Sequence, residues 1–390
     1  MARNISSSDP ANVLIAGGGF GAVEAMLAVR ALVPERVSVT LISDSTKLAY
    51  RPAATMEAFE ETPPLTYDLH AIAADVGASI RLDRLEAVAP NDHSVRLASF
   101  AHLDYGALIL AVGARAASAI PGALTFHDQN EVHHIRRLMS ELRSGELRRI
   151  IFAVPNGCSW PLPLYELALL TATRLRELYV ASEVMLVSPE ITPLSVFGEQ
   201  ASLLVADLLV ERGVGFMGES EPERVDRSGA LVLASGEALD ADRVVAAPKL
   251  RGPRITGLPT DRSGFVTTDA LGSVIGLPDV YAAGDMTSFP IKQGGLAAQQ
   301  ADVIAQRIAS NHGVSVTQSR VHRVLRAQLV GGAHPVFLRT ELDEFGQVIA
   351  ASTVHGHFSD SESVTPPEKV FGRYLSPYLH TRTPVLSASE

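Results

Sequence analysis

The residues best suited to chemistry near the start of the chain form a glycine-rich turn, GGGFGA, at residues 17–22. It follows an apolar run at 13–16 and precedes apolar residues at helical spacing, so we expect it to join a buried strand to a helix. Gly17 permits a tight turn, Gly19 lets the backbone approach a pyrophosphate without a Cβ in the way, and Ala22 lets the helix pack close to the sheet. The amides that begin the helix favour phosphate binding. The predicted contact residues are Gly17, Gly19, Phe20, Gly21 and Ala22.

A second strand is expected at residues 37–42, and polar residues follow it directly. In a strand–helix–strand unit of this kind, an acceptor at the end of the second strand binds the ribose hydroxyls of adenosine, about 20 residues after the turn. Ser43 occupies the position of the usual acidic residue, and Asp44 stands one place later. Both are candidate ribose ligands, so the unit predicts a site for an adenine dinucleotide.

Composition narrows the classes to which the chain can belong. The 390 residues are 46% hydrophobic and only 19% charged, which excludes a disordered chain. A net charge of −10 argues against binding to a nucleic acid backbone. The single cysteine, Cys158, excludes an intramolecular disulfide, a Cys-x-x-Cys centre and a four-cysteine metal site, and we expect no bound metal.

Two strand–helix–strand patterns organise the chain. The first surrounds the glycine-rich turn, and the second has expected strands at 149–154 and 183–187 around an expected helix at 162–178. Their spacing of about 135 residues predicts two similar domains, the second inserted in the first. The fold class is α/β: two Rossmann-like three-layer dinucleotide-binding domains plus a small C-terminal region rich in β-strands, because residues 321–353 alternate like three strands. The expected boundaries are 1–120 and 255–315 for the two parts of the first domain, 121–254 for the second domain and 316–390 for the C-terminal region.

A second signature, the sequence YAAGD at residues 281–285, precedes an expected helix near Gln293. Together with the glycine-rich turn and the stretch YGALILAVG at residues 105–113, it resembles the FAD-dependent pyridine nucleotide-disulfide oxidoreductase family. The closer resemblance is to the type II NADH dehydrogenase and sulfide:quinone oxidoreductase branch, and it covers roughly residues 12–312. The pair of FAD motifs carries it, because either motif alone is unspecific.

The resemblance implies roles for the matched positions. Asp285 corresponds to the aspartate that hydrogen-bonds the ribityl chain of FAD, with Gly284 allowing close approach of the backbone. Residues 111–113 resemble the A-T-G segment that closes over the cofactor. These residues are Ala111, Val112 in place of the threonine, and Gly113. The remaining implied contacts are Arg51 and Pro52, where the family's chain passes the isoalloxazine ring, and Ala87, on the strand that meets the adenine.

The start of the expected helix near residue 293 also has an electrostatic interpretation. A reduced flavin carries negative charge on the pyrimidine side of its ring. Lys292 and the amides of Gln293, Gly294 and Gly295 would supply positive charge there and raise the electron affinity of the flavin. Lys292 is therefore a candidate catalytic residue, and the alternative is an ordinary surface lysine.

The turn of the second domain, at residues 154–163, departs from the family pattern. NADH-using members carry G-x-G-x-x-G there, whereas this chain retains only Gly157, and three prolines remove amide donors. We expect this domain to keep the fold but to bind NAD(P)H poorly, with Glu190 as a remaining candidate for a ribose. FAD is the expected cofactor.

Cys158 lies in the same turn, at a place that resembles the position of a cysteine in the sulfide:quinone branch. The resemblance places it near the flavin and makes it a second candidate catalytic residue, through a flavin adduct or a mixed disulfide. That branch needs at least two cysteines to carry sulfur, so ordinary sulfide oxidation is not expected. A small buried cysteine is the preferred interpretation.

These features predict an FAD-dependent oxidoreductase that passes two electrons from a small-molecule donor through the flavin to an acceptor such as a quinone. One alternative is an NAD(P)H dehydrogenase of the type II kind. Another is a flavin-binding redox sensor or partner subunit without turnover. The identity of the donor and the acceptor and the oligomeric state stay open at this point.

The expected location is the cytoplasm. The first eleven residues lack the apolar core of a signal peptide, and the chain has no run of about 18 uncharged apolar residues. A short amphipathic stretch at residues 368–379 leaves three alternatives open: peripheral contact with lipid, cover over the flavin pocket, or a dimer contact.

Overall fold

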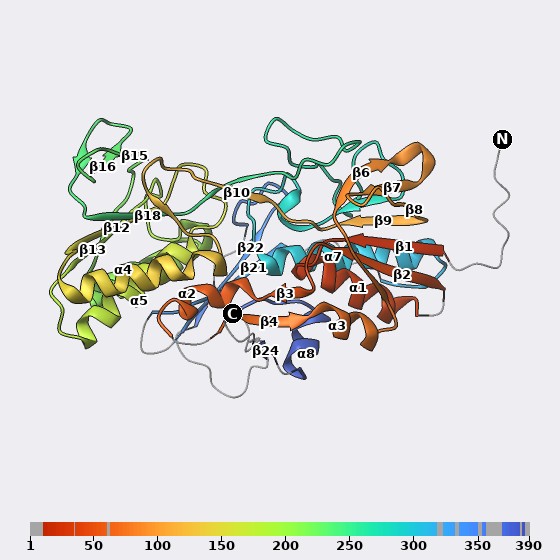
Figure 1. The fold of residues 1–390 in the computed structure, drawn as a ribbon, viewed down its shortest axis with the longest axis horizontal. Coiled ribbons are helices and arrows are strands. Elements are labelled where there is room, and N and C mark those ends of the chain that lie inside the picture. Colours follow the sequence, from red (N-terminus) through yellow and green to blue (C-terminus); the bar gives the residue numbers. More distant parts are fainter. Residues whose placement is uncertain are drawn as a thin grey trace.

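The computed structural model describes residues 11–34, 36–60, 63–317, 323–331, 335–349, 353–355, 369–382 and 384–386. Two five-stranded parallel sheets dominate it and lie at opposite ends of the molecule in Figure 1. The first sheet has the strand order β20-β9-β1-β2-β5. Its strands are β1 (Ala11–Ala16), β2 (Val37–Ser43), β5 (Ser79–Leu82), β9 (Ala107–Leu110) and β20 (Val280–Ala282).

Alternating residues of β1 face two different cores. Val13 and Ile15 pack with α1 (Phe20–Leu32) and α7 (Gly294–Asn311) on one face of the sheet. Leu14 and Ala16 pack on the other face, beneath a three-stranded antiparallel layer. Burial on both faces explains why β1, β9 and β20 are almost wholly apolar. The covering layer consists of β6 (Leu85–Ala89), β7 (Ser94–Leu97) and β8 (His102–Asp104).

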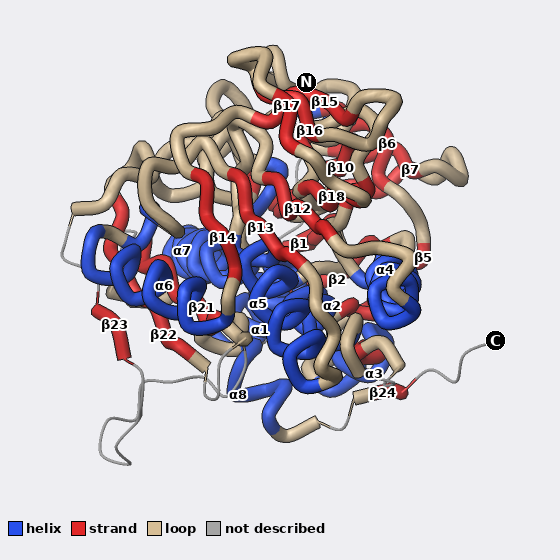
Figure 2. Tube along the Cα trace, turned by 90° about the vertical axis from the view of Figure 1, so that its left-hand side faces the viewer, coloured by secondary structure: helices blue, strands red, loops and turns tan. Residues whose placement is uncertain are grey.

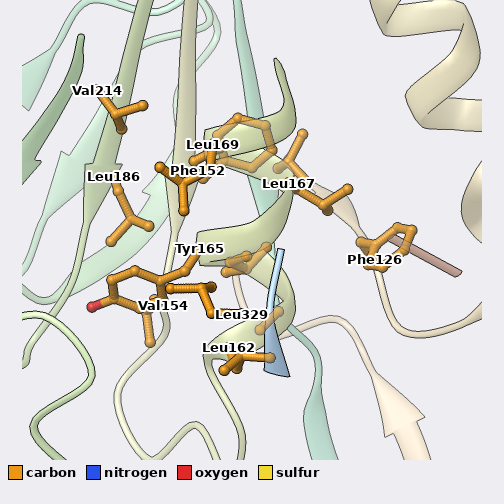
Figure 3. Close-up of a cluster of buried hydrophobic side chains, with 14 of the residues drawn as sticks. Phe126, Phe152, Val154, Leu162, Tyr165, Leu167, Leu169, Leu186, Val214 and Leu329 are labelled. Atoms are coloured by element: carbon orange, nitrogen blue, oxygen red, sulfur yellow. The ribbon is translucent and has the colours of Figure 1, made fainter. Parts of the chain in front are cut away.

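The second sheet has the order β11-β18-β12-β13-β14 and is also parallel. Its strands are β11 (Leu124–Thr125), β12 (Arg149–Ala153), β13 (Glu183–Val187), β14 (Val214–Met217) and β18 (Arg243–Ala246). One face packs against α4 (Val132–Ser144), α5 (Leu162–Glu177) and α6 (Glu199–Arg212), which lie together beside the strands in Figure 2. Figure 3 shows this core, in which Phe152 and Leu186 of the sheet meet Leu169 of α5. The other face is covered by β15 (Pro222–Val225), β16 (Leu231–Leu233) and β17 (Ala238–Leu239).

The second sheet is an insertion between two strands of the first. The chain leaves the first sheet after β9 and returns to it at β20, which pairs with β9 in parallel. The outgoing strand β10 (Arg115–Ala117) and the returning strand β19 (Lys249–Arg251) form a two-stranded antiparallel ribbon between the domains. This topology confirms the predicted α/β fold class with one three-layer domain inserted in the other.

The remaining elements connect the domains to the end of the chain. The three strands expected in the tail are β21 (Arg323–Leu329), β22 (Val336–Leu342) and β23 (Thr353–His355), in one antiparallel sheet. The last described residues return to the first domain, because β24 (Val385–Leu386) pairs with β4 (Leu65–Asp68), which also pairs with β3 (Lys47–Ala49). The other helices are α2 (Ala54–Glu57), α3 (Leu69–Asp75) and α8 (Leu375–His380). No helix among the described residues is long and apolar enough to span a membrane.

Candidate functional site

The ends of three neighbouring strands open onto a cavity of about 330 Å³. Ala16, Leu110 and Ala282 are in register across β1, β9 and β20, so the loops that follow them meet at one edge of the sheet. This is the edge at which open parallel sheets bind ligands. The lining residues of this glycine-turn cavity are Gly18, Gly19, Phe20, Gly21, Ser43, Asp44, Ser45, Lys47, Ala49, Arg51, Ala111, Val112, Gly113, Asp128, Gln129, Asn130, Ala283, Gly284, Asp285, Gly294 and Ala297.

The glycines of the turn have two different tasks. Gly17 has φ +134°, and a Cβ there would lie 2.2 Å from the carbonyl oxygen of Ala111, so only glycine allows the ends of β1 and β9 to meet. A Cβ on Gly19 would have no atom within 4 Å, because this residue faces open space at the start of α1. The first task is structural, and the second leaves bare backbone for a phosphate.

The two candidate ribose ligands are in different situations. The Ser43 hydroxyl is buried; it donates to the carbonyl oxygen of Ser45 at 2.9 Å and accepts from the Ser45 amide at 3.1 Å. Asp44 is exposed, lines the cavity, and its carboxylate has no hydrogen bond within the described residues. The geometry therefore favours Asp44 over Ser43 as the ribose acceptor.

Asp285 stands at the inner end of this cavity, in the 3-10 turn η5 (Gly284–Met286). Burial raises the pKa of its carboxyl, and the nearby charges of Lys292, Arg51 and His127 oppose that rise. In the part of the chain that the structure describes, no group donates a hydrogen bond to this carboxylate. A half-buried carboxylate that lines a cavity and lacks a donor fits a polar ligand that supplies hydroxyl groups.

Lys292 is buried, so the surface-lysine alternative is wrong. Its Nζ donates to the carbonyl oxygen of Thr287 and lies 4.0 Å from the centroid of the Phe265 ring. Burial lowers the pKa of Lys292 to about 8, while Asp285 and Asp261 oppose the change. A positive charge held in the interior beside Asp285 is suited to stabilise negative charge that develops on a ligand.

The start of α7 completes this wall. Gln293 is the N-cap of the helix; its Oε1 accepts from the Leu296 amide at 2.9 Å. A Cβ on Gly294 would lie 2.8 Å from the ring of Phe20, so the helix begins directly against the glycine-rich turn. Gly294 lines this cavity, and Gln293 lines an adjoining one.

A second cavity, of about 190 Å³, adjoins the first, since Phe20, Arg51, Asp285 and Gly294 line both. Most of its wall is apolar, and both domains and the end of the chain contribute to it. We call it the apolar cavity. Its lining residues are Phe20, Arg51, Pro52, Thr55, Phe126, His127, Cys158, Ser159, Trp160, Leu162, Pro163, Leu164, Glu166, Ala247, Pro248, Leu250, Asp285, Lys292, Gln293, Gly294, Ala327, Gln328, Lys369 and Val370.

An ion pair is buried in the wall of the apolar cavity. Lys369 Nζ lies 2.7 Å from both carboxylate oxygens of Glu166, and the two side chains are 6% and 2% exposed. Thr55 Oγ1 and the Val330 amide also donate to this carboxylate, at 2.7 and 3.1 Å. Buried charge is tolerated here because every oxygen of Glu166 is hydrogen-bonded. These residues were missed from sequence, although a glutamate in an otherwise apolar run was a usable signal.

In the second domain, the candidate ribose acceptor Glu190 is already hydrogen-bonded to neighbouring side chains. The Tyr165 hydroxyl donates to Glu190 Oε2 at 2.6 Å and Ser188 Oγ donates to the same oxygen at 3.0 Å, so Glu190 is not free to hold a ribose. At the start of α5 the N-cap is Pro161, and the Leu164 amide already bonds to its carbonyl oxygen. The phosphate-binding features of the first domain are therefore lacking in this turn.

Cys158 lines the apolar cavity as a free, half-buried cysteine. Burial raises the pKa of Cys158 to about 11, with a smaller contribution from Glu190. The nucleophile in cysteine chemistry is the thiolate, so this environment favours the small buried cysteine over an adduct-forming residue.

Most predicted site residues line one of the two cavities. The exceptions are Gly17, Ala22, Ala87, Glu190 and Gly295. Gly17 and Ala22 support the cavity without lining it. Gly17 allows the tight turn after β1, and Ala22 is fully buried against the sheet. Ala87 does not line either cavity; β6 pairs it with Arg96 of β7 and a bridge joins it to Thr256. The chain breaks between β5 and β6 near Asp83, and this break places Ala87 in the covering layer.

Sequence reasoning also missed polar residues at the mouth of the glycine-turn cavity. Lys47 and residues 128–130 line it, and Arg51 pairs with Asp128 at 3.6 Å. Asp128 and Glu131 form a capping box before α4. Their D-x-x-E spacing is a helix-start signal that would have located this segment.

The glycine-turn cavity fits FAD. Its bare backbone at Gly19 suits the pyrophosphate, and Asp44 suits the adenosine ribose. The half-buried carboxylate of Asp285, to which no described group donates, suits the hydroxyls of a ribityl chain. The glycine-turn cavity meets the apolar cavity at Arg51 and Gly294, which line both spaces.

Comparison with known proteins agrees with this site. A family model described as pyridine nucleotide-disulphide oxidoreductase matches residues 11–303. The chain is 27% identical over 297 residues to the biphenyl dioxygenase system ferredoxin–NAD(+) reductase component of Paraburkholderia xenovorans (strain LB400), covering 73% of this chain and 69% of that protein. It is 26% identical over 374 residues to the chlorobenzene dioxygenase ferredoxin reductase component of Cupriavidus sp. (strain PS12), covering 85% and 84%.

Solved structures share the fold. The sulfide:quinone oxidoreductase of Aquifex aeolicus superposes with a TM-score of 0.75 at 17% identity, covering 89% of this chain and 87% of that one. The ferredoxin reductase for the CYP199A2 system from Rhodopseudomonas palustris gives a TM-score of 0.68 at 19% identity, covering 85% and 82%. At such identities the likeness concerns the fold, and the chemistry rests on the site.

Proposed function

Since the chain belongs to the pyridine nucleotide-disulphide oxidoreductase family, we propose that it is an FAD-dependent oxidoreductase whose flavin exchanges two electrons with an apolar small molecule of the quinone class. The observation that carries this proposal is the continuity of the two cavities. A mostly apolar pocket opens onto the place where the flavin ring is expected, and the two spaces share Phe20, Arg51, Asp285 and Gly294. An apolar wall with a few polar groups is typical of small-molecule sites.

The bound flavin supplies the two-electron chemistry, and the chain's own groups set its conditions. Asp285 orients the cofactor by accepting hydrogen bonds. The Lys292 ammonium provides positive charge next to it. The aromatic and aliphatic wall, including Phe126 and Trp160, excludes water from the reacting centre.

The buried ion pair matches the proton demand of a quinone, which takes up two protons with its two electrons. Lys369 Nζ carries protons at the cavity wall, and Glu166 and Thr55 hold that ammonium in place. A purely hydride-accepting site with no proton exchange has no need of a charge pair in its apolar wall, where burial is costly.

Purified protein tests the proposal directly. It should be yellow and release FAD on denaturation. After anaerobic photoreduction, mixing with 2-methyl-1,4-naphthoquinone should restore the oxidised flavin spectrum within the mixing time of a stopped-flow instrument. A flavin that stays reduced with excess quinone would remove the quinone class, and colourless protein that takes up no FAD would remove the whole proposal.

A pyridine nucleotide as electron donor is the second candidate. The retained fold of the second domain favours it, as does the likeness to a protein named as a ferredoxin–NAD(+) reductase. The occupied Glu190 and the proline-rich turn weigh against it. Anaerobic mixing with NADH and with NADPH discriminates: bleaching of the flavin supports the donor, and an unchanged spectrum at millimolar nucleotide rejects it. Steady turnover with any acceptor excludes a non-catalytic flavin-binding subunit.

A further inference from the structure

The end of the chain forms part of the apolar cavity although it lies outside the family-matched residues 11–303. We call residues 369–382 the strap. Lys369 and Val370 line the cavity, and the Val370 amide donates to the Tyr50 hydroxyl at 3.3 Å. The strap then crosses α7 and α1 and ends in α8, whose Leu375 and Leu379 join the core of the first domain. In Figure 1 α8 lies beneath α1 and α3.

One buried carboxylate in the middle of α1 holds the strap. Glu24 is fully buried, its Oε1 accepts from the Tyr374 amide at 2.9 Å, and its Oε2 accepts from the Leu375 amide at 2.7 Å. A Cβ on Gly372 would lie 2.6 Å from Glu24 Oε2, so the strap is pressed against this side chain. In the described part of the chain, all hydrogen bonds of Glu24 go to backbone amides of the strap.

Burying the Glu24 carboxylate costs free energy, and its hydrogen bonds to the strap offset that cost. Its neighbours on α1 are apolar and belong to the core of the first domain. A buried carboxylate loses its hydrogen bonds to water, and here backbone amides of the strap replace them. Glu24 therefore anchors the strap at Tyr374 and Leu375. The strap residues that line the cavity, Lys369 and Val370, come earlier in the chain.

We propose that Glu24 is a positioning residue, which fixes the strap so that Lys369 and Val370 complete the apolar cavity and thereby sets the affinity for the molecule bound there. This inference rests on the proposed function for its substrate. The released strap would take Lys369 away from Glu166 and open one wall of the cavity. Glu24 itself touches neither cavity, so it acts only through the strap.

Charged groups around Glu24 make the anchor sensitive to pH. Asp302 of α7 faces it, and Arg373 and Tyr374 of the strap lie beside it; Arg373 pairs with Asp302 at 3.5 Å. Burial raises the pKa of Glu24 from 4.5 to about 7, Asp302 adds to the rise, and the strap amides oppose it. The docked strap therefore holds a proton that the released strap gives up, so docking weakens as pH rises from about 5 to about 7 and is constant above that.

The test compares Glu24→Ala, Glu24→Gln and a matched control. Asp242→Ala is the control because that carboxylate also accepts two successive backbone amides, from Arg148 and Arg149 at 2.7 and 2.9 Å, but in the second domain away from the cavities. We expect Glu24→Ala to raise the KM for 2-methyl-1,4-naphthoquinone about tenfold with little change in kcat and in FAD content, the loss of roughly one charged hydrogen bond. The control should leave KM unchanged.

Glu24→Gln mimics the protonated side chain. It distinguishes an effect on the position of the strap from a general loss of protein stability. It should keep a low KM and abolish the rise of KM between about pH 5 and pH 7. Amide hydrogen exchange gives a readout independent of turnover: Glu24→Ala should lose protection in residues 369–382, whereas Asp242→Ala should not. If Glu24→Ala kept wild-type protection of the strap amides against exchange, the inference would be overturned even if the protein turned over no quinone. In an active enzyme, equal rises of KM in Glu24→Ala and Asp242→Ala would also overturn it.

Discussion

Lys369 and Glu166 lie 203 residues apart in the chain, yet Lys369 Nζ sits 2.7 Å from both oxygens of the Glu166 carboxylate. The pair joins the end of the chain to α5 of the inserted domain. It does so inside the wall of the apolar cavity, where both side chains are almost completely withdrawn from water. The cavity thus depends on contacts that assemble only after both domains and the tail have docked.

Breaking this pair should be strongly destabilising. Lys369→Met leaves a buried carboxylate without its cation, and we expect a loss of about 3–5 kcal/mol in the free energy of unfolding. The double variant Glu166→Leu with Lys369→Met should recover most of the loss but not quinone turnover. Urea unfolding of the FAD-bound protein measures the first effect. Arg174→Ala, which breaks an exposed pair with Glu177, is the control and should cost under about 0.5 kcal/mol. A Lys369→Met variant as stable as this control would contradict the buried pair.

The FAD-binding half of the site could be predicted from sequence because its signals are local. The glycine-rich turn, the acceptor after β2 and the Gly284-Asp285 turn each lie directly after a strand, and the carboxyl ends of neighbouring parallel strands meet at one edge. The Rossmann-like topology followed from the same periodicity. That Ala87 does not line the cavity was not foreseeable, because the break in the chain at Asp83 depends on a hydrogen bond from the Asp83 amide to the Ser43 carbonyl oxygen of another strand.

The wall of the apolar cavity and the anchor of the strap could not be predicted, for the opposite reason. Glu166, Lys369 and Glu24 are single charged residues with no spacing rule, and their partners lie far away in the chain. Neither the burial of Lys292 nor the preference for Asp44 over Ser43 is visible in a pattern, because both depend on the neighbours that the fold brings to each side chain.

The ribose acceptor is tested by two neighbouring substitutions. Asp44→Asn removes the negative charge of the side chain that, unlike Ser43, has no hydrogen bond to its described neighbours. We expect this change to lower FAD affinity about tenfold. Ser43→Ala should change it less than threefold, because the Ser43 hydroxyl is already bonded to Ser45. Titration of apoprotein with FAD, followed by flavin fluorescence, gives both affinities. The reverse order of effects would reassign the ligand to Ser43.

Cys158 should be dispensable. Because burial raises the pKa of its thiol to about 11, less than about 1% is thiolate at pH 8. We expect Cys158→Ala to retain FAD and turnover within about twofold of the wild type, and iodoacetamide to label the native protein far more slowly than the unfolded chain. Loss of turnover in Cys158→Ala with normal FAD content would restore a catalytic role for the thiol.

Lys292 should tune the flavin through its charge. Its ammonium deprotonates as pH rises through about 8, because burial lowers the pKa and the opposing carboxylates restore it only in part. Above that pH the positive charge beside Asp285 disappears, so the midpoint potential of the flavin should fall more steeply with pH than in a variant without the lysine. At pH 7 we expect Lys292→Met to lower the potential by about 30 mV, the two-electron equivalent of about 1.4 kcal/mol. Lys249→Met, at an exposed position of β19, is the control and should leave the potential unchanged. Identical potentials in Lys292→Met and the wild type at pH 7 would show that this ammonium does not stabilise the reduced flavin.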